Sequence, residues 1–117
     1  MLVKMILSAA APFAVAAALA APAAAQSFDC AAAETDDEKA ICDSGRLSAL
    51  DDEMAALYRD VEASALMGTR ADVQEAQRAF LTERRNCGSN EGCITALYRE
   101  RIADLKATKE AVGRGAN

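Results

Sequence analysis

Apolar positions recur at steps of three and four residues through most of the chain after residue 46. This spacing places them on one face of a helix with a 3.6-residue period. No stretch alternates apolar and polar residues as a half-buried strand does, and no Asn-Gly or Asp-Gly hairpin turn is present. The pattern therefore predicts an all-α domain, a small bundle of three to four helices. The three predicted inner faces are Leu47, Leu50, Met54, Leu57, Tyr58, Val61 and Ala65; Val73, Ala76, Gln77, Phe80, Leu81 and Arg84; and Ile94, Leu97, Tyr98, Ile102 and Leu105.

Capping residues predict where these helices begin and end. The run 35–38, Thr-Asp-Asp-Glu, has the form of a capping box and predicts a short first helix over 36–43. Ser44 is suited to cap the second helix. We expect Gly68 to end that helix and Thr69 to cap the third. The break at 88–90, Gly-Ser-Asn, supplies a glycine for a helix C-terminus and two residues suited to the next N-cap.

The N-terminal segment has the composition of an export signal. Lys4 precedes an uncharged, alanine-rich run that ends in three alanines at 23–25. Small residues at that point fit signal-peptidase cleavage, which we expect between Ala25 and Gln26. The alternative, a membrane anchor, is disfavoured because two prolines interrupt the run and alanine is only weakly apolar.

This assignment divides the chain into three parts: a cleaved signal at 1–25, a helical domain at 26–110 and a disordered tail at 111–117. It also predicts that the protein is periplasmic or secreted, without a stable membrane anchor.

The mature chain is acidic. Removing residues 1–25 takes away Lys4 as the only charged residue and changes the net charge from −5 to −6. Nucleic acids and anionic lipids require clustered cations, so the acidic balance favours a basic protein partner or serves only solubility. The candidate partner-binding residues are Glu34, Asp36, Asp37 and Glu38, although acidic side chains also stabilise a helix N-terminus without any partner.

Residues suited to catalysis are scarce. The chain has no histidine, and it contains no nucleophile-elbow, zinc-protease or phosphate-loop motif. Two carboxylates could in principle hydrolyse a glycoside, but the acidic residues fall mostly on outer faces and in first helical turns. We expect no enzymatic activity, no cofactor and no metal site.

All four cysteines lie in the exported part, at Cys30, Cys42, Cys87 and Cys93. Their spacing does not match the paired ligands of a zinc site, so disulfides are expected. Three pairings are possible, and loop-closure entropy of about 2.5 to 4 kcal/mol per bridge does not choose among them. Cys87 and Cys93 flank a tight helix corner, so geometry favours their pairing, with Cys30 bonded to Cys42.

Polar side chains occupy or adjoin several positions of the inner faces. Asp51, Arg84 and Arg101 are charged, and Tyr58 and Tyr98 add hydroxyl groups. A buried polar network joining the helices would explain them, with Asp51 bonded to Arg84, Arg101 or a tyrosine hydroxyl. The alternative is a polar cluster that faces a ligand.

Several short motifs together resemble the LprI-like lysozyme-inhibitor family, over nearly the whole mature chain. They are Phe28-Asp29-Cys30, the run 38–42 (EKAIC), Leu47-x-x-Leu50-Asp51, Tyr58, Gln77-Arg78-x-Phe80-Leu81, Arg84-x-x-Cys87-Gly88, Cys93 and Tyr98-x-x-Arg101-Ile102. The resemblance implies a small helical domain of exported bacterial proteins, some of which bind and inhibit lysozyme. Two features depart from the family pattern: Phe80 stands where Trp is frequent, and Ser27-Phe28-Asp29 before Cys30 does not form a lipidation site.

Two functions follow as hypotheses. The first is an inhibitor that occludes the cleft of a lysozyme-type muramidase, without chemistry of its own. The second is an accessory protein of the cell envelope that holds another envelope protein on the same helical domain. The sequence gives no indication of the oligomeric state.

Overall fold

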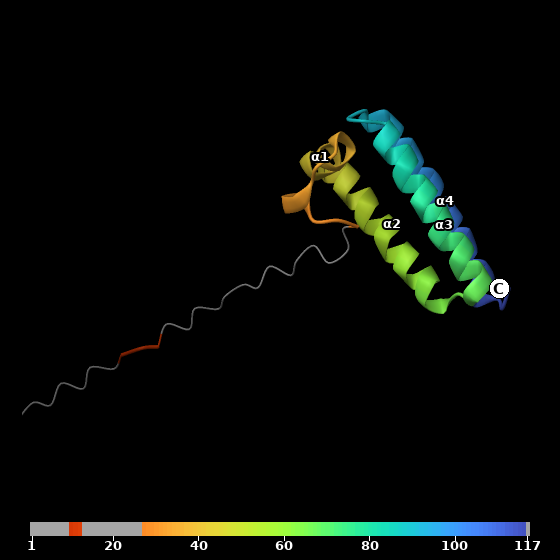
Figure 1. The fold of residues 1–117 in the computed structure, drawn as a ribbon. Helices are drawn as coiled ribbons and strands as arrows, with labels where there is room; N and C mark the ends of the chain where they lie inside the picture. The colour runs from red at the N-terminus through yellow and green to blue at the C-terminus, as the bar shows by residue number, and fades with distance from the viewer. Residues whose placement is uncertain (1–9, 13–26, 117) are drawn as a thin grey trace, which may run out of the picture.

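The computed structural model describes residues 10–12 and 27–116. The expected cleavage site and, apart from residues 10–12, the expected signal lie outside these residues. A short 3-10 helix, η1, comes first and four α-helices follow it (Figure 1). The elements are η1 at Cys30–Ala32, α1 at Asp36–Asp43, α2 at Gly45–Ser64, α3 at Met67–Asn86 and α4 at Glu91–Gly113.

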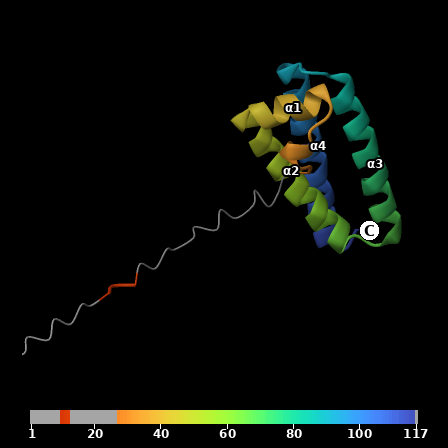
Figure 2. The same ribbon diagram turned by 60° about the vertical axis from the view of Figure 1, so that its left-hand side comes forward.

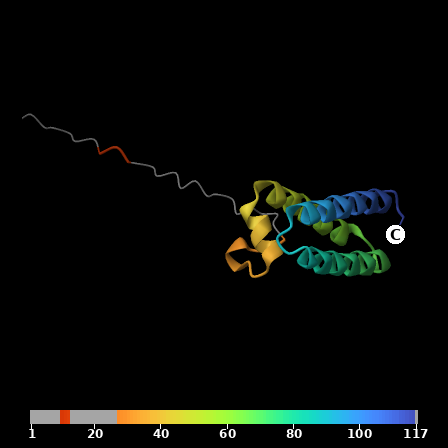
Figure 3. The same cartoon turned by 90° about the horizontal axis from the view of Figure 1, so that it is seen from above.

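The three long helices run up and down beside one another, and α1 lies across one end of them (Figures 1 and 2). Helix α2 packs mainly against α4, whereas α3 makes fewer contacts with either helix and stands apart from α2 (Figure 3). The part of the chain that the structure describes contains no strand, which confirms the all-α prediction. None of its helices combines the length and the apolar character needed to cross a bilayer.

Local capping fixes most of the helix boundaries as predicted. Thr35 and Glu38 form the capping box of α1. The Ser44 hydroxyl accepts the amide of the third residue along at 3.2 Å and so begins α2. At the α3–α4 corner, Gly88 adopts a φ of 57°, which favours glycine, and Asn90 caps α4. Helix α4 continues to Gly113 and so includes the first residues of the segment 111–117.

The prediction for the α2–α3 corner was wrong. Helix α2 ends at Ser64, and α3 begins at Met67, so Gly68 and Thr69 lie in its first turn. A side chain replaces the expected glycine cap: Arg70 donates to the carbonyl oxygens of Glu62 and Ala65, both at 2.9 Å. Because these carbonyls at the end of α2 are satisfied from α3, the chain can turn without a left-handed residue.

The core lies between α2, α3 and α4 and is closed at one end by Ile41 from α1. Phe80 and Tyr98 meet edge to face at its centre, with ring centroids 5.2 Å apart. One inner-face prediction was wrong. Ala76 is exposed, because it lies on the side of α3 that faces solvent. Ala55 on α2, which was not among the predicted inner-face positions, is buried. The buried apolar cluster comprises Ile41, Leu47, Met54, Val61, Val73, Phe80, Ile94, Tyr98, Ile102 and Leu105.

Two disulfides fix the ends of this arrangement, and the predicted pairing is confirmed. Cys30 bonds to Cys42 with a Cα–Cα distance of 5.8 Å, and Cys87 bonds to Cys93 at 5.6 Å. The first holds the N-terminal segment, including Phe28, against α1. The second closes the corner between α3 and α4.

Replacing Cys30 and Cys42 together by alanine should lower the free energy of unfolding by about 3 kcal/mol, because the unfolded chain regains the entropy of an open loop. The same change at Cys87 and Cys93 should cost slightly less, since that loop is shorter. Urea unfolding of the oxidised proteins measures both values. Unchanged midpoints in both double variants would show that packing alone holds the domain.

Candidate functional site

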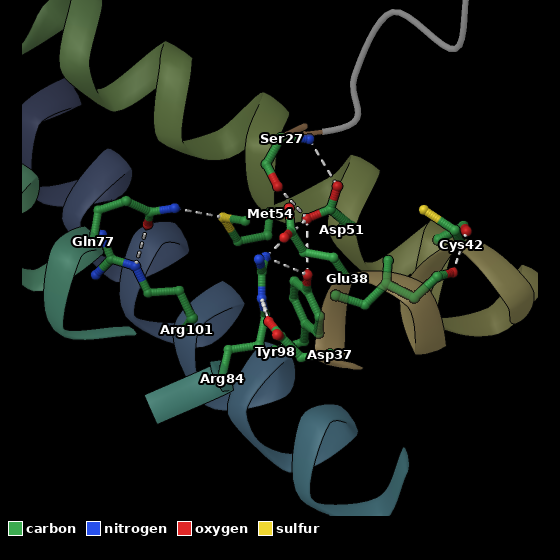
Figure 4. A network of polar contacts seen from close by, with 12 residues as sticks. Ser27, Asp37, Glu38, Cys42, Asp51, Met54, Gln77, Arg84, Tyr98 and Arg101 are labelled. Atoms are coloured by element: carbon green, nitrogen blue, oxygen red, sulfur yellow. Dashed lines mark hydrogen bonds and ion pairs between the residues drawn. The ribbon is translucent and has the colours of Figure 1, made fainter. Parts of the chain in front are cut away.

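A buried carboxylate on α2 is the centre of a polar network (Figure 4). Asp51 is fully buried. Its Oδ1 accepts hydrogen bonds from the Tyr98 hydroxyl at 2.8 Å and from the Ser27 hydroxyl at 2.6 Å, and its Oδ2 accepts from the Ser27 amide at 2.7 Å. These bonds tie α4 and the N-terminal segment to α2, and they satisfy a charge that burial would otherwise destabilise.

Arg84 on α3 joins the same network from the opposite side. Its Nε donates to Asp37 Oδ2 at 2.7 Å, and its Nη1 donates to the Tyr98 hydroxyl at 3.1 Å and lies 3.8 Å from Asp51 Oδ1. The guanidinium also lies 5.3 Å from the centroid of the Phe28 ring, which covers it. One arginine therefore contacts residues of α1, α2, α4 and the N-terminal segment.

The ion pair of Asp37 and Arg84 is charged at neutral pH. Burial by itself raises the pKa of Asp37, but the nearby Thr35 hydroxyl and the Arg84 guanidinium lower it more, and the net pKa lies below its ordinary value. Burial lowers the pKa of Arg84, and Tyr98 and Asp37 outweigh this effect and raise it. Burial raises the pKa of Tyr98 far above its ordinary value, so its hydroxyl keeps the proton that it donates to Asp51.

Two residues predicted for this network lie elsewhere. The Tyr58 hydroxyl donates to Glu62 on its own helix at 2.7 Å, and burial raises its pKa to about 12. Arg101 Nε donates to Gln77 Oε1 at 3.0 Å, and its Nη2 donates to the Val73 carbonyl at 3.1 Å. The structure thus unites Asp51, Arg84 and Tyr98 and separates Arg101 into a second contact between α3 and α4.

The candidate partner-binding residues divide between surface and interior. Glu34 and Asp36 are exposed. Glu38 is half-buried and accepts the Thr35 amide at 3.2 Å and the Thr35 hydroxyl at 2.7 Å. Asp37 is only 1% exposed, because its carboxylate turns inward to Arg84. Asp37 therefore belongs to the buried network and presents no charge to a partner.

A groove opens beside the network, between the N-terminal segment, α2 and α3. Its volume is about 930 Å³. It lies between α2 and α3, which pack on each other less extensively than α2 packs on α4. The lining residues are Ser27, Phe28, Glu34, Thr35, Glu38, Ala55, Tyr58, Arg59, Gln74, Gln77, Arg78, Leu81, Arg84 and Arg85.

The groove is lined by both apolar and charged side chains, which suits non-covalent binding. Ala55 and Leu81 contribute apolar surface, and Arg59 and Arg78 stand on α2 and α3 respectively. No group of three or more acidic, cysteine or histidine side chains among the described residues is placed to hold a metal ion. Sequence reasoning did not find this groove, because periodicity identifies the face of a helix that is buried but not the distance between two helices.

The fold and site define a small, disulfide-linked helical domain with a groove that is lined partly by charged side chains. The chain belongs to the LprI family of lysozyme inhibitors: the family model described as "Lysozyme inhibitor LprI" matches residues 30–105, which include both disulfides and the network residues of all four α-helices. No curated protein matches the chain. No solved structure matches it either.

Replacing Asp51 by alanine should destabilise the domain far more than replacing its neighbour Asp52, which takes no part in the network. The expected loss is up to about 3 kcal/mol, because the Tyr98 hydroxyl and Ser27 lose their acceptor and Arg84 loses an ion-pair partner at 3.8 Å. Chemical denaturation of both variants measures the difference. Equal midpoints would mean that the Asp51 carboxylate contributes no net stability in the interior.

Acid should weaken the contact between Asp37 and Arg84. Because the pKa of Asp37 is lower in the folded state than its ordinary value of 3.8, the contact stabilises the fold above about pH 4, and the stabilisation is lost as pH falls through the folded-state pKa. An Asp37→Asn variant should therefore lose less stability than the wild type between pH 5 and about pH 2. Urea unfolding at a series of pH values tests this, with Asp36→Asn as the exposed control. If the stability of Asp37→Asn fell with pH as steeply as that of the wild type, the assignment of the acid-sensitive contact to Asp37 would be wrong.

Proposed function

We propose that this chain inhibits a lysozyme-type muramidase by binding it and occluding the substrate cleft. The observation that carries the proposal is the match to the lysozyme-inhibitor family over residues 30–105. Such a function needs a stable, complementary surface and no reactive group. Lysozymes hydrolyse glycosides with two carboxylates in a cleft, so a bound domain that blocks the cleft is sufficient to inhibit them.

The buried network and the disulfides support this function by limiting movement of the binding surface. Arg84 joins α3 to α1 and α4, and Cys30–Cys42 holds the N-terminal segment in place. A surface that is already ordered loses little conformational entropy when a partner binds. Without these links, a domain of about 90 residues would lose more conformational entropy when the partner binds.

Charge supports a basic muramidase as the partner. The mature chain carries a net charge of −6 once the signal is removed. Around the start of α1, the exposed acidic residues are Asp29, Glu34 and Asp36. An acidic surface increases the association rate with a basic protein, and the effect weakens with salt because the Debye length falls to about 8 Å at physiological ionic strength.

Export with cleavage between Ala25 and Gln26 is part of the proposal, since the inhibitor must meet muramidase outside the cytoplasm. The contacts of Ser27 support this boundary. Its amide and hydroxyl both bond to Asp51, so a residue next to the expected new N-terminus takes part in the buried network. Cleavage after Ala25 keeps the Ser27 nitrogen as a peptide amide and leaves this contact intact.

Purified, oxidised protein should slow the lysis of cell-wall substrate by at least one lysozyme in a panel of animal, invertebrate and goose-type enzymes. The inhibition should weaken between low and physiological salt, and an Asp36→Asn variant should associate more slowly with a basic lysozyme. Turbidity assays and binding kinetics measure the two effects. Lys39→Gln, which removes a positive charge from the same helix, is the control and should not slow association.

The absence of both binding and inhibition across the panel at micromolar concentrations of folded protein would refute the inhibitor proposal. In that case, recovery of a native envelope protein with the purified domain would favour the accessory function.

A further inference from the structure

We propose that the groove between α2 and α3 docks a short, acidic, amphipathic helix of a protein partner. This site goes beyond muramidase inhibition in two ways. It is a second binding surface, and its ligand is acidic, whereas the proposed muramidase is basic. Although the mature chain is acidic, three arginines outside the buried network line the groove, Arg59, Arg78 and Arg85, together with two acidic residues, Glu34 and Glu38. The fourth lining arginine, Arg84, is already paired with Asp37. The acidic surface and the basic groove therefore favour different ligands.

The arginines on α3 differ in how their charges are satisfied. Arg84 is buried and paired with Asp37. The side chains of Arg78 and Arg85 make no hydrogen bond or ion pair with any residue in the described part of the chain. Both residues are exposed and line the groove, so their guanidinium groups are accessible to a carboxylate and can form charge-assisted hydrogen bonds with it.

The spacing on α3 matches a facing helix. Arg78, Leu81 and Arg85 follow one another at steps of three and four, so they share one face of α3. The two guanidinium-bearing positions lie about 10 Å apart along the axis, at about 1.5 Å per residue. A partner helix with glutamates seven residues apart and an apolar residue between them presents the complementary pattern. This is the helix-in-groove mode of recognition.

The apolar part of the lining supports a proteinaceous occupant rather than a free anion. Leu81 and Ala55 offer apolar surface that a small inorganic anion would not cover. The α3 lining from Gln74 to Arg85 spans about 16 Å, enough for three helical turns.

The probe is a labelled peptide of about 15 residues, long enough to form a helix, with two glutamates seven positions apart and a leucine midway. A scrambled peptide of the same composition controls for charge alone. Fluorescence anisotropy with the oxidised mature protein should show that the patterned peptide binds at least about tenfold more tightly than the scrambled one. Equal affinities, or equal competition by inorganic polyphosphate, would overturn the proposal in favour of a nonspecific anion site.

Single variants locate the binding surface. Arg78→Glu and Arg85→Glu should each weaken peptide binding by about tenfold, because each replaces an attraction by a repulsion. Arg99→Glu, an equal change of charge at an exposed position of α4, should leave the affinity unchanged. Thermal unfolding verifies that all three variants are folded. If Arg99→Glu lost as much affinity for the peptide, the effect would come from long-range charge alone, and the proposed site would be refuted.

Two further outcomes separate this site from other assignments. Concentration-dependent dimerisation that the peptide abolishes would show that a second copy of the chain fills the groove, which would overturn the assignment to a different partner. Lysozyme inhibition that persists in Arg78→Glu and Arg85→Glu while peptide binding is lost would support two separate surfaces. Peptide binding without inhibition of any lysozyme would contradict the proposed function and leave the docking site supported.

Discussion

The burial of one guanidinium constrains the arrangement of the whole domain. Arg84 is 5% exposed, and a cation in that position is stable only if anionic and polar acceptors surround it. Asp37 from α1 and the Tyr98 hydroxyl from α4 accept its hydrogen bonds, and Asp51 on α2 accepts the proton of that hydroxyl. Each helix must therefore lie at a particular distance from α3. An apolar core of this size would tolerate several packings, but few of them satisfy this charge.

The same constraint connects the interior to the candidate binding surfaces. Arg84 contacts Phe28 on one side and contributes to the wall of the groove on another. Ser27 on the N-terminal segment donates to Asp51, so the part of this segment that lines the groove is held by the network itself. Because the network holds these residues in place, the surface available to a partner is also rigid. A rigid surface loses less conformational entropy when a partner binds.

Sequence reasoning predicted the helices and the cysteine pairing because both depend on local rules. Capping residues, a 3.6-residue period and the reach of a disulfide across a corner are all properties of short segments. It also identified Asp51, Arg84 and Tyr98, because a polar residue on an apolar face requires a buried partner. It placed Asp37 on the surface, since an acidic residue in a first helical turn already has a sufficient explanation there.

Other features depend on distances between segments, which the pattern does not contain. The contact of Ser27 with Asp51 joins residues 24 positions apart, and no periodicity marks it. The replacement of a glycine cap by Arg70 depends on how α3 approaches the end of α2. The groove arises from the position of α3 relative to α2, which follows from the sum of the packing contacts and the buried ion pair.

A double-mutant cycle on Asp37 and Arg84 tests the central role of the buried network most directly. Asp37→Asn, Arg84→Met and the double variant are compared by urea unfolding at neutral pH. If the pair acts as a unit, the double variant should lose less stability than the sum of the single variants, with a coupling energy of about 2 kcal/mol. Additive losses, with a coupling energy near zero, would show that the two charges are stabilised independently and would contradict the account.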